Sequence, residues 1–124
     1  MQRVLVITGG DVLMRADLDH LVTRARTNGL HVALAPSVTP LLTDERMGRL
    51  RELGVKVASL SIDGSTASTH DTMRGIPNHL EASVEAIRRL RSQGYTVQIN
   101  TTVTTLNADK VEEIHDLAED LGVD

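Results

Sequence analysis

One pattern repeats four times along the sequence and restricts the fold more than any other feature. An apolar run of strand length is followed by a polar turn, an amphipathic segment of helix length and a glycine. Glycine is favoured just past a helix end because it adopts the left-handed conformation there without strain. The four helix ends read Asn28-Gly29-Leu30, Leu53-Gly54-Val55, Gln93-Gly94-Tyr95 and Leu121-Gly122-Val123. The alternation predicts an α/β fold of four consecutive strand–helix units, with parallel strands joined by right-handed crossovers.

Apolar runs and helix caps give the expected bounds of each element. Residues 4–7 are four consecutive apolar residues, which predicts a strand buried on both faces. The other expected strands are 30–35, 55–62 and 95–103. Asp17, Thr43 and Asn107 are expected to cap helices that end near the glycines, and a further helix is expected over 79–93. The polar connection over 65–78 has room for one short helix. Four strands do not close a parallel barrel, which normally takes eight, so a half-barrel or a small open sheet is expected.

Length and composition limit the classes of protein. The 124 residues are expected to form one domain, 1–124, with a core of aliphatic side chains. A net charge of −4 argues against a nucleic-acid partner, which usually binds a basic face. No apolar run or leader predicts a membrane span or export, so a cytoplasmic location is expected. The sequence has no cysteine, which excludes disulfides and thiolate metal sites.

Polar residues follow each expected strand, where parallel α/β folds bind their ligands. The four strand ends are Thr8-Gly9-Gly10-Asp11, Ser37-Val38-Thr39, Ser61-Ile62-Asp63-Gly64 and Asn100-Thr101-Thr102. Hydroxyls, carboxylates and backbone amides would converge there, which suits a small polar ligand with a ribose, an amine or a carboxylate. Each strand end taken alone is better explained as a turn or a helix cap, whereas the four together favour a ligand site. Arg74 in the long connection is a candidate for binding a carboxylate through two parallel hydrogen bonds.

The chemistry-bearing side chains show no catalytic pattern. No Ser-His-Asp arrangement, phosphate-binding loop or dinucleotide fingerprint is present. His20, His79 and His115 are expected on helix surfaces, and no histidine has a metal-binding spacing. His70, which precedes Asp71 in the long connection, is the one histidine considered as a weak candidate metal ligand.

Five short motifs, in this order and spacing, resemble the radical S-adenosylmethionine (SAM) enzymes. The resemblance covers essentially all 124 residues and is nearest to the group with a C-terminal cluster-binding extension, whose members act in heme and peptide-cofactor maturation. The motifs are Thr8-Gly9-Gly10-Asp11, residues 36–43, Ser59-Leu60-Ser61-Ile62-Asp63-Gly64, residues 70–75 and residues 98–103. The family fold is a partial (β/α)6 barrel. In it SAM binds a [4Fe–4S] cluster on a CxxxCxxC loop and is cleaved reductively, so that a substrate hydrogen can be abstracted.

The resemblance implies a role for each matched position. Gly9, Gly10 and Asp11 would bind the SAM amino group, although an aspartate stands where the family more often has glutamate. Ser61 and Asp63 would contact the SAM carboxylate and ribose, and Arg74 would bind the carboxylate. Asn100 and Thr102 would line the next strand end, near the adenosine. Ser37, at the second strand end, completes the set of candidate SAM-binding residues.

The lack of cysteine separates this chain from the family. The three cluster cysteines and the family's first and sixth strands have no counterpart, so the chain resembles the second to fifth units of the barrel. It is expected to bind SAM without being able to hold the cluster or to catalyse the reaction alone. Its partners would be a small-molecule ligand together with the missing barrel segments or a second copy. One alternative is a non-catalytic half-barrel module that self-associates, because two copies supply eight strands, or that is an engineered or truncated fragment. A weaker one is an independent enzyme that uses Asp11 or Asp63 as a base.

Overall fold

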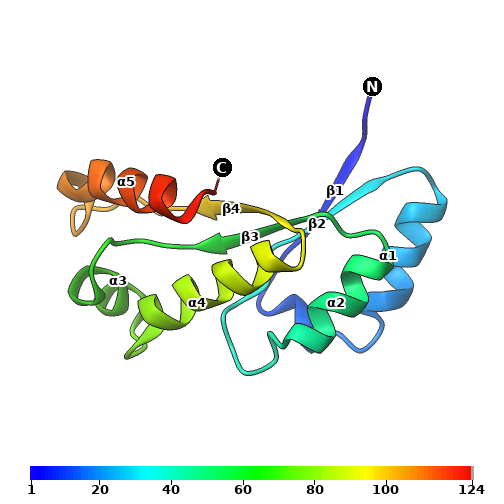
Figure 1. The fold of residues 1–124 in the computed structure, drawn as a ribbon, viewed down its shortest axis with the longest axis horizontal. Helices are drawn as coiled ribbons and strands as arrows, with labels where there is room; N and C mark the ends of the chain where they lie inside the picture. The colour runs from blue at the N-terminus through cyan, green and yellow to red at the C-terminus, as the bar shows by residue number, and fades with distance from the viewer. Residues whose placement is uncertain (124) are drawn as a thin grey trace.

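A computed structural model, which describes residues 1–123, contains one sheet of four parallel strands in chain order (Figure 1). The strands are β1 (Val4–Ile7), β2 (His31–Leu34), β3 (Val57–Ser61) and β4 (Thr96–Asn100). The helices are α1 (Leu18–Thr27), α2 (Asp44–Glu52), α3 (Ala67–Arg74), α4 (His79–Ser92) and α5 (Val111–Leu121), with 3₁₀ turns at Val12–Met14 and Ala108–Lys110. The predicted α/β fold of four parallel strand–helix units is therefore confirmed. The short helix expected in the long connection is α3.

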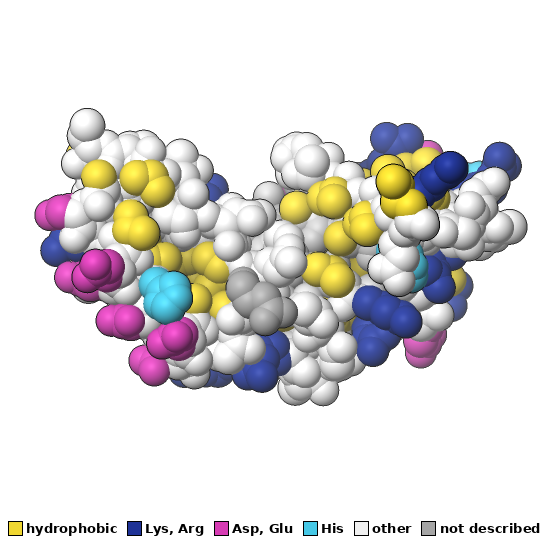
Figure 2. All heavy atoms as spheres, turned by 90° about the horizontal axis from the view of Figure 1, so that it is seen from above, with side chains coloured by type: hydrophobic (Ala, Val, Ile, Leu, Met, Phe, Trp, Pro, Cys, Tyr) yellow, Lys and Arg dark blue, Asp and Glu magenta, His cyan; other side chains and the backbone are white. Residues whose placement is uncertain are grey.

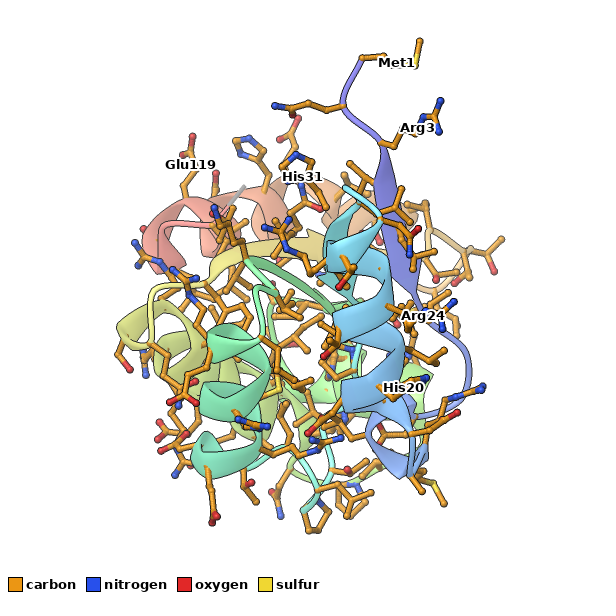
Figure 3. The ribbon with its side chains drawn as sticks, turned by 90° about the vertical axis from the view of Figure 1, so that its right-hand side faces the viewer. Met1, Arg3, His20, Arg24, His31 and Glu119 are labelled. Carbon is orange, nitrogen blue, oxygen red and sulfur yellow. The ribbon has the colours of Figure 1, made fainter. Side chains whose placement is uncertain are left out.

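The core lies between the helices and one face of the sheet. Successive side chains of a strand point to opposite faces of the sheet, and those on the face covered by helices, such as Leu34 of β2 and Leu60 of β3, belong to the same cluster as the inward faces of the helices. From the helices this cluster includes Leu18, Val22, Met47, Leu50, Ile87, Leu90, Ile114 and Leu121. Figure 3 shows His20 and Arg24 on the outer side of α1, where both are exposed. None of the helices within residues 1–123 is both long and apolar enough to span a membrane.

Strand β1 is more exposed than its sequence predicts. Val4 is 60% exposed and Val6 is 53% exposed, so the prediction of a strand buried on both faces is wrong. The reason is its place in the sheet: β1 lies at an edge and pairs with β2 alone. Figure 2 shows the surface hollowed between the two ends of the molecule, with hydrophobic side chains exposed on both sides of the hollow.

The predicted helix caps have three different outcomes. Thr43 caps α2 as expected, because its hydroxyl accepts a hydrogen bond of 3.1 Å from the backbone N–H of Arg46. Asp17 precedes α1 but pairs with Arg15 instead of capping the helix. Asn107 makes no side-chain cap, so that prediction is wrong; its side chain is fully buried and holds the site described below.

Candidate functional site

A cavity of about 460 Å³ lies at the carboxyl ends of the four strands. Six of the nine predicted site residues line it: Gly9, Gly10, Ser37, Ser61, Arg74 and Asn100. The parallel register explains why residues so distant in sequence meet. Ser61 of β3 lies beside Asn100 of β4, and the ends of β1 and β2 continue in register through the hydrogen bond from Ala35 N–H to the Ile7 carbonyl. The structure thus brings most of the predicted set to one place.

The Gly9–Gly10 pair leaves open space at the cavity wall. A Cβ built on either glycine would meet no atom within 4 Å. Gly9 also has a φ of 152°, which residues with side chains rarely adopt. The backbone of this turn is therefore accessible to a ligand, as the sequence predicts.

Asp11 lies beside the cavity and ties two of its loops together. One carboxylate oxygen accepts hydrogen bonds from the backbone N–H of Leu13 at 3.1 Å and, at 3.5 Å, from that of Ser37. The other accepts from the Thr39 hydroxyl at 3.0 Å. These bonds fix the loop after β1 against the loop after β2. Asp11 is absent from the lining and is held by the protein's own donors.

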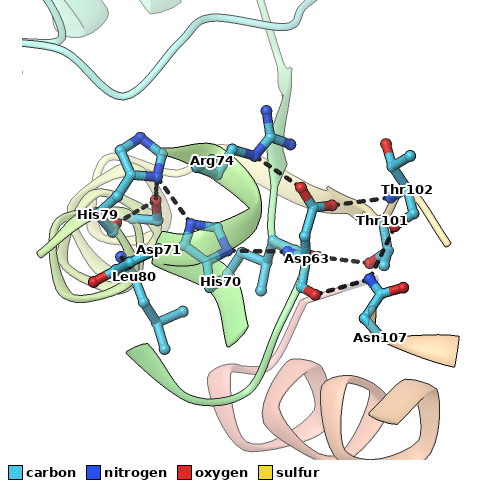
Figure 4. Close-up of polar contacts among 11 residues, drawn as sticks. Asp63, His70, Asp71, Arg74, His79, Leu80, Thr101, Thr102 and Asn107 are labelled. Carbon is cyan, nitrogen blue, oxygen red and sulfur yellow. Dashed lines mark hydrogen bonds and ion pairs between the residues drawn. The ribbon is translucent and has the colours of Figure 1, made fainter. Parts of the chain in front are cut away.

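Asp63 is buried behind the cavity, where it joins three segments (Figure 4). One carboxylate oxygen forms an ion pair with Arg74 Nε at 2.8 Å, and the other accepts a hydrogen bond of 2.9 Å from the backbone N–H of Thr102. Thr102 itself is exposed and contributes its backbone to this contact. Neither Asp63 nor Thr102 lines the cavity, so the structure places both in its supporting wall.

Asn107 fastens the segment after β4 to the end of β3. Its amide nitrogen donates hydrogen bonds to the carbonyls of Asp63 and Thr102, each at 2.9 Å, and its amide oxygen accepts from the Thr104 N–H at 2.8 Å. A buried side chain that satisfies three backbone groups is costly to replace. Sequence reasoning missed this role because asparagine before a helix is more often a cap.

Two histidines occupy the junction between α3 and α4 (Figure 4). His70 is fully buried, its Nδ1 accepts a hydrogen bond of 3.0 Å from the Asp63 N–H, and its Nε2 lies 2.8 Å from His79 Nδ1. Burial is the largest cause that lowers the pKa of His70, and the neighbouring His79 lowers it further. His79 is half-buried and lines the cavity, which contradicts its expected place on a helix surface. Exposed His20 and His115 are on helix surfaces as predicted.

Asp71 completes this junction from α3. Its carboxylate accepts a hydrogen bond of 2.8 Å from the backbone N–H of Leu80, in the first turn of α4. This contact satisfies one of the unpaired donors at the helix start. It also holds α4, and with it His79, against α3.

The wall of the cavity carries one full charge, which is positive. Arg74 is the one lining residue that carries a full charge, and the other polar groups on the wall are hydroxyls, the Asn100 amide and the His79 ring. Such a set can bind a ligand that has one carboxylate and several hydroxyl or amine groups. The volume of about 460 Å³ is within the range of small-molecule sites.

Candidate metal ligands lie elsewhere. In the part of the chain that the structure describes, one group of metal-type side chains comes within ligand distance of one another: His115, Asp116 and Glu119 on α5. All three are exposed and none lines the cavity. His70 uses both ring nitrogens in hydrogen bonds, which leaves it no lone pair directed at a metal.

Comparison with known proteins places the sequence in a defined group. Residues 1–121 match the family described as the radical SAM superfamily. The chain is 43% identical over 119 residues to an AdoMet-dependent heme synthase of Oleidesulfovibrio alaskensis, which covers 96% of this chain and 30% of that protein. It is 32% identical over 120 residues to a pre-heme d1 synthase of Dinoroseobacter shibae, with 97% and 29% covered. The chain thus spans about a third of the length of these curated relatives.

The solved structures agree on the fold. A domain of a pyruvate-formate lyase-activating enzyme from Bacteroides vulgatus superposes with a TM-score of 0.69 at 19% identity. The match covers 90% of this chain and 69% of that one. At this identity the likeness concerns the fold alone.

Proposed function

The chain belongs to the radical SAM superfamily, and from this premise we propose that its cavity binds SAM. The observation that carries the proposal is the cavity itself, in which four strand ends bring hydroxyls, bare glycine backbone and a single guanidinium together. We propose that residues 1–124 are the second to fifth strand–helix units of a radical SAM domain. The chain would then supply most of the SAM site without the cluster.

The groups on the wall fit the parts of SAM. The guanidinium of Arg74 is suited to its carboxylate, because arginine binds planar carboxylates through two parallel hydrogen bonds. Ser61 and Asn100 are suited to the ribose hydroxyls, and the open backbone of Gly9 and Gly10 is suited to the amino-acid end. Asp11, Asp63 and Thr102, which the resemblance also assigns to SAM, would act by holding the loops and Arg74 in place.

A [4Fe–4S] cluster does not fit these residues. The sequence has no cysteine, and the cavity wall offers no other set of cluster ligands. We therefore propose that a segment outside this sequence would supply the cluster, and that the residues of this cavity would hold SAM beside it. The exposed edge of β1 is where such a segment would extend the sheet.

The relatives suggest the reaction of the intact protein. Proteins named AdoMet-dependent heme synthase match almost all of this chain at 40 to 43% identity. We propose that the intact protein acts in heme or cofactor maturation. The 124 residues would contribute SAM binding to that reaction.

A second candidate is a non-catalytic half-barrel that pairs with its own copy. The exposed apolar side chains of β1 favour it, since an uncovered edge strand is a template for pairing. Sedimentation equilibrium distinguishes the two candidates. A stable dimer that Val6→Lys dissociates supports self-association, whereas a monomer at all concentrations contradicts it.

Calorimetric titration with SAM tests the first proposal. We expect saturable, weak binding that Arg74→Gln reduces about tenfold, because a charge-assisted hydrogen-bond pair is lost. Arg88→Gln, on the exposed face of α4, is the matched control and should bind as the unchanged chain does. No heat at millimolar SAM, or equal affinities for the two variants, would contradict the proposed site.

A further inference from the structure

We propose that His79 is a ligand-binding residue, held by His70 in the one tautomer that presents an N–H to a carboxylate in the cavity. The inference deepens the proposed function, on which the choice of SAM as the carboxylate ligand rests. It adds a second donor beside Arg74. It also gives the buried His70 a positioning role.

The tautomer of His70 follows from its partner. A backbone N–H can only donate, so the bond of 3.0 Å from Asp63 N–H makes His70 Nδ1 an acceptor. A neutral imidazole with an unprotonated Nδ1 carries its hydrogen on Nε2. Burial favours this neutral form, since it lowers the pKa of His70. His70 therefore donates through Nε2.

The tautomer of His79 follows in turn. Its Nδ1 lies 2.8 Å from His70 Nε2, so it must accept that hydrogen bond. The two ring planes differ by 7°, and the N···N distance is shorter than the ~3.5 Å spacing of stacked rings, so the contact joins ring edges. The Ser83 hydroxyl also lies 3.4 Å from His79 Nδ1, but it donates its hydrogen to the His79 carbonyl at 2.8 Å, so His70 is the donor to Nδ1. The hydrogen of neutral His79 is consequently on Nε2.

His79 lines the cavity, and Nε2 is the ring nitrogen that its contact with His70 leaves free. Figure 4 shows this nitrogen directed to the same side as the terminal nitrogens of the Arg74 guanidinium, without a partner among the residues drawn. Both residues line the same cavity wall. A buried chain of hydrogen bonds thus leads from Asp63 through His70 to a donor that a ligand can use.

Charge identifies the class of ligand group. The wall carries one guanidinium, and its charge is already shared with Asp63 through the 2.8 Å ion pair. A neutral N–H beside a partly compensated cation suits a singly charged, planar acceptor better than a dianion such as phosphate. A carboxylate that binds Arg74 through both oxygens can also accept from His79 at one of them, because each oxygen has two lone pairs. The pair would then select ligands that carry a carboxylate.

Nitrogen-15 NMR of the histidine side chains tests the tautomer directly. We expect the spectra at neutral pH to show both His70 and His79 protonated on Nε2 alone. Replacing His70 with asparagine, which keeps an acceptor for the Asp63 N–H, should release His79 into a mixture of tautomers. A proton on His79 Nδ1 in the unchanged protein, or no response to His70→Asn, would overturn the inference.

Acetate tests the ligand class without relying on SAM binding. We expect acetate to shift the His79 Nε2 signal, whereas its neutral analogue acetamide should not. A response to neither compound, or to both equally, would overturn the carboxylate assignment. If acetate acts and SAM does not bind, the inference stands and the proposed function fails.

SAM and its decarboxylated form provide the final comparison. We expect His79→Phe to weaken SAM binding about tenfold and to leave binding of the decarboxylated form unchanged. His115→Phe on the exposed face of α5 is the control and should change neither affinity. Equal effects on both ligands, or no effect on SAM, would overturn the role of His79 while leaving the SAM site itself in place.

Discussion

Arg74 Nε lies 2.8 Å from Asp63 Oδ2, and this contact couples the wall of the cavity to the inside of the protein. The Asp63 side chain is 5% exposed, whereas that of Arg74 is 31% exposed. The carboxylate therefore remains behind the wall while the guanidinium reaches the cavity. We conclude that Asp63 orients Arg74 and that Arg74 is the residue available to a ligand.

Replacing Asp63 by asparagine should destabilise the protein. The amide keeps the shape but leaves Arg74 without its counter-charge, and it can place an N–H against the guanidinium. Removing one partner of a buried pair costs a few kcal/mol, and the partial exposure of Arg74 reduces this to about 2 kcal/mol. Urea unfolding followed by circular dichroism measures the change. Asp120→Asn on the exposed face of α5 should stay within about 0.5 kcal/mol, and equal values for the two variants would contradict the ion pair.

Asn107→Ala should lower the free energy of unfolding more than the same substitution at any exposed asparagine. It leaves the carbonyls of Asp63 and Thr102 and the N–H of Thr104 without their partner, which we expect to lower the free energy of unfolding by about 3 kcal/mol. Asn28→Ala, at the exposed end of α1, is the comparison, with an expected loss under about 1 kcal/mol. If urea unfolding gave similar losses of free energy for the two variants, the buried Asn107 amide would not be what holds these segments together.

Substitution by alanine should change the stability of the protein in opposite directions at two glycines. A Cβ at Gly64 would lie 2.6 Å from the backbone nitrogen of His70, so Gly64→Ala should destabilise the fold by about 2 kcal/mol. Gly48 is inside α2 with no atom within 4 Å of its Cβ position, so Gly48→Ala should stabilise by up to about 1 kcal/mol. Thermal unfolding of both variants checks the sign, and a stabilised Gly64→Ala would contradict the close approach of α3.

Stability should depend on pH through His70. Its folded pKa is below the ordinary 6.5, so below that pH the unfolded chain binds a proton that the folded chain does not. The free energy of unfolding should therefore fall as the pH drops from 6.5, by at most about 1.4 kcal/mol per pH unit for this one group. Burial and the neighbouring His79 and Arg74 lower the pKa of His70, whereas Asp63 and Asp71 raise it.

The matched measurement uses His70→Asn. Unfolding curves at several pH values between neutral and about pH 5 should show a smaller slope for this variant than for the unchanged protein. The difference between the two slopes isolates His70 from the exposed histidines. Identical slopes would show that His70 is not held neutral in the fold.

The repeat of strands, helices and glycines predicted the fold well, because local signals dominate it. The helix-ending glycines and the Thr43 cap are read from residues close in sequence. The polar strand ends also predicted the cavity, since parallel strands must bring their carboxyl ends to one edge. The burial of β1 could not be predicted, because an apolar run does not reveal whether a strand lies inside or at the edge of a sheet.

Residues that act through another residue were the hardest to predict. Asn107 looks like a helix cap, and its true contacts with Asp63 and Thr102 come from segments 44 and 5 residues away. In the sequence, His79 resembles the exposed first residue of a helix. Its position in the structure depends on the turn between α3 and α4, which brings His70 Nε2 within 2.8 Å of His79 Nδ1. One signal was available in the sequence: His70 and His79 are nine residues apart, on either side of Gly75 and Pro77, which favour a turn.

The most direct test of SAM binding by the cavity is a titration of the nitrogen-15-labelled protein with SAM, followed through its backbone amide signals. We expect the signals of Gly9, Gly10, Ser37, Ser61 and Asn100 to shift together and saturate, while those on the outer faces of α2 and α5 stay in place. Shifts that gather on the outer faces of the helices, or no shift at millimolar SAM, would contradict the account.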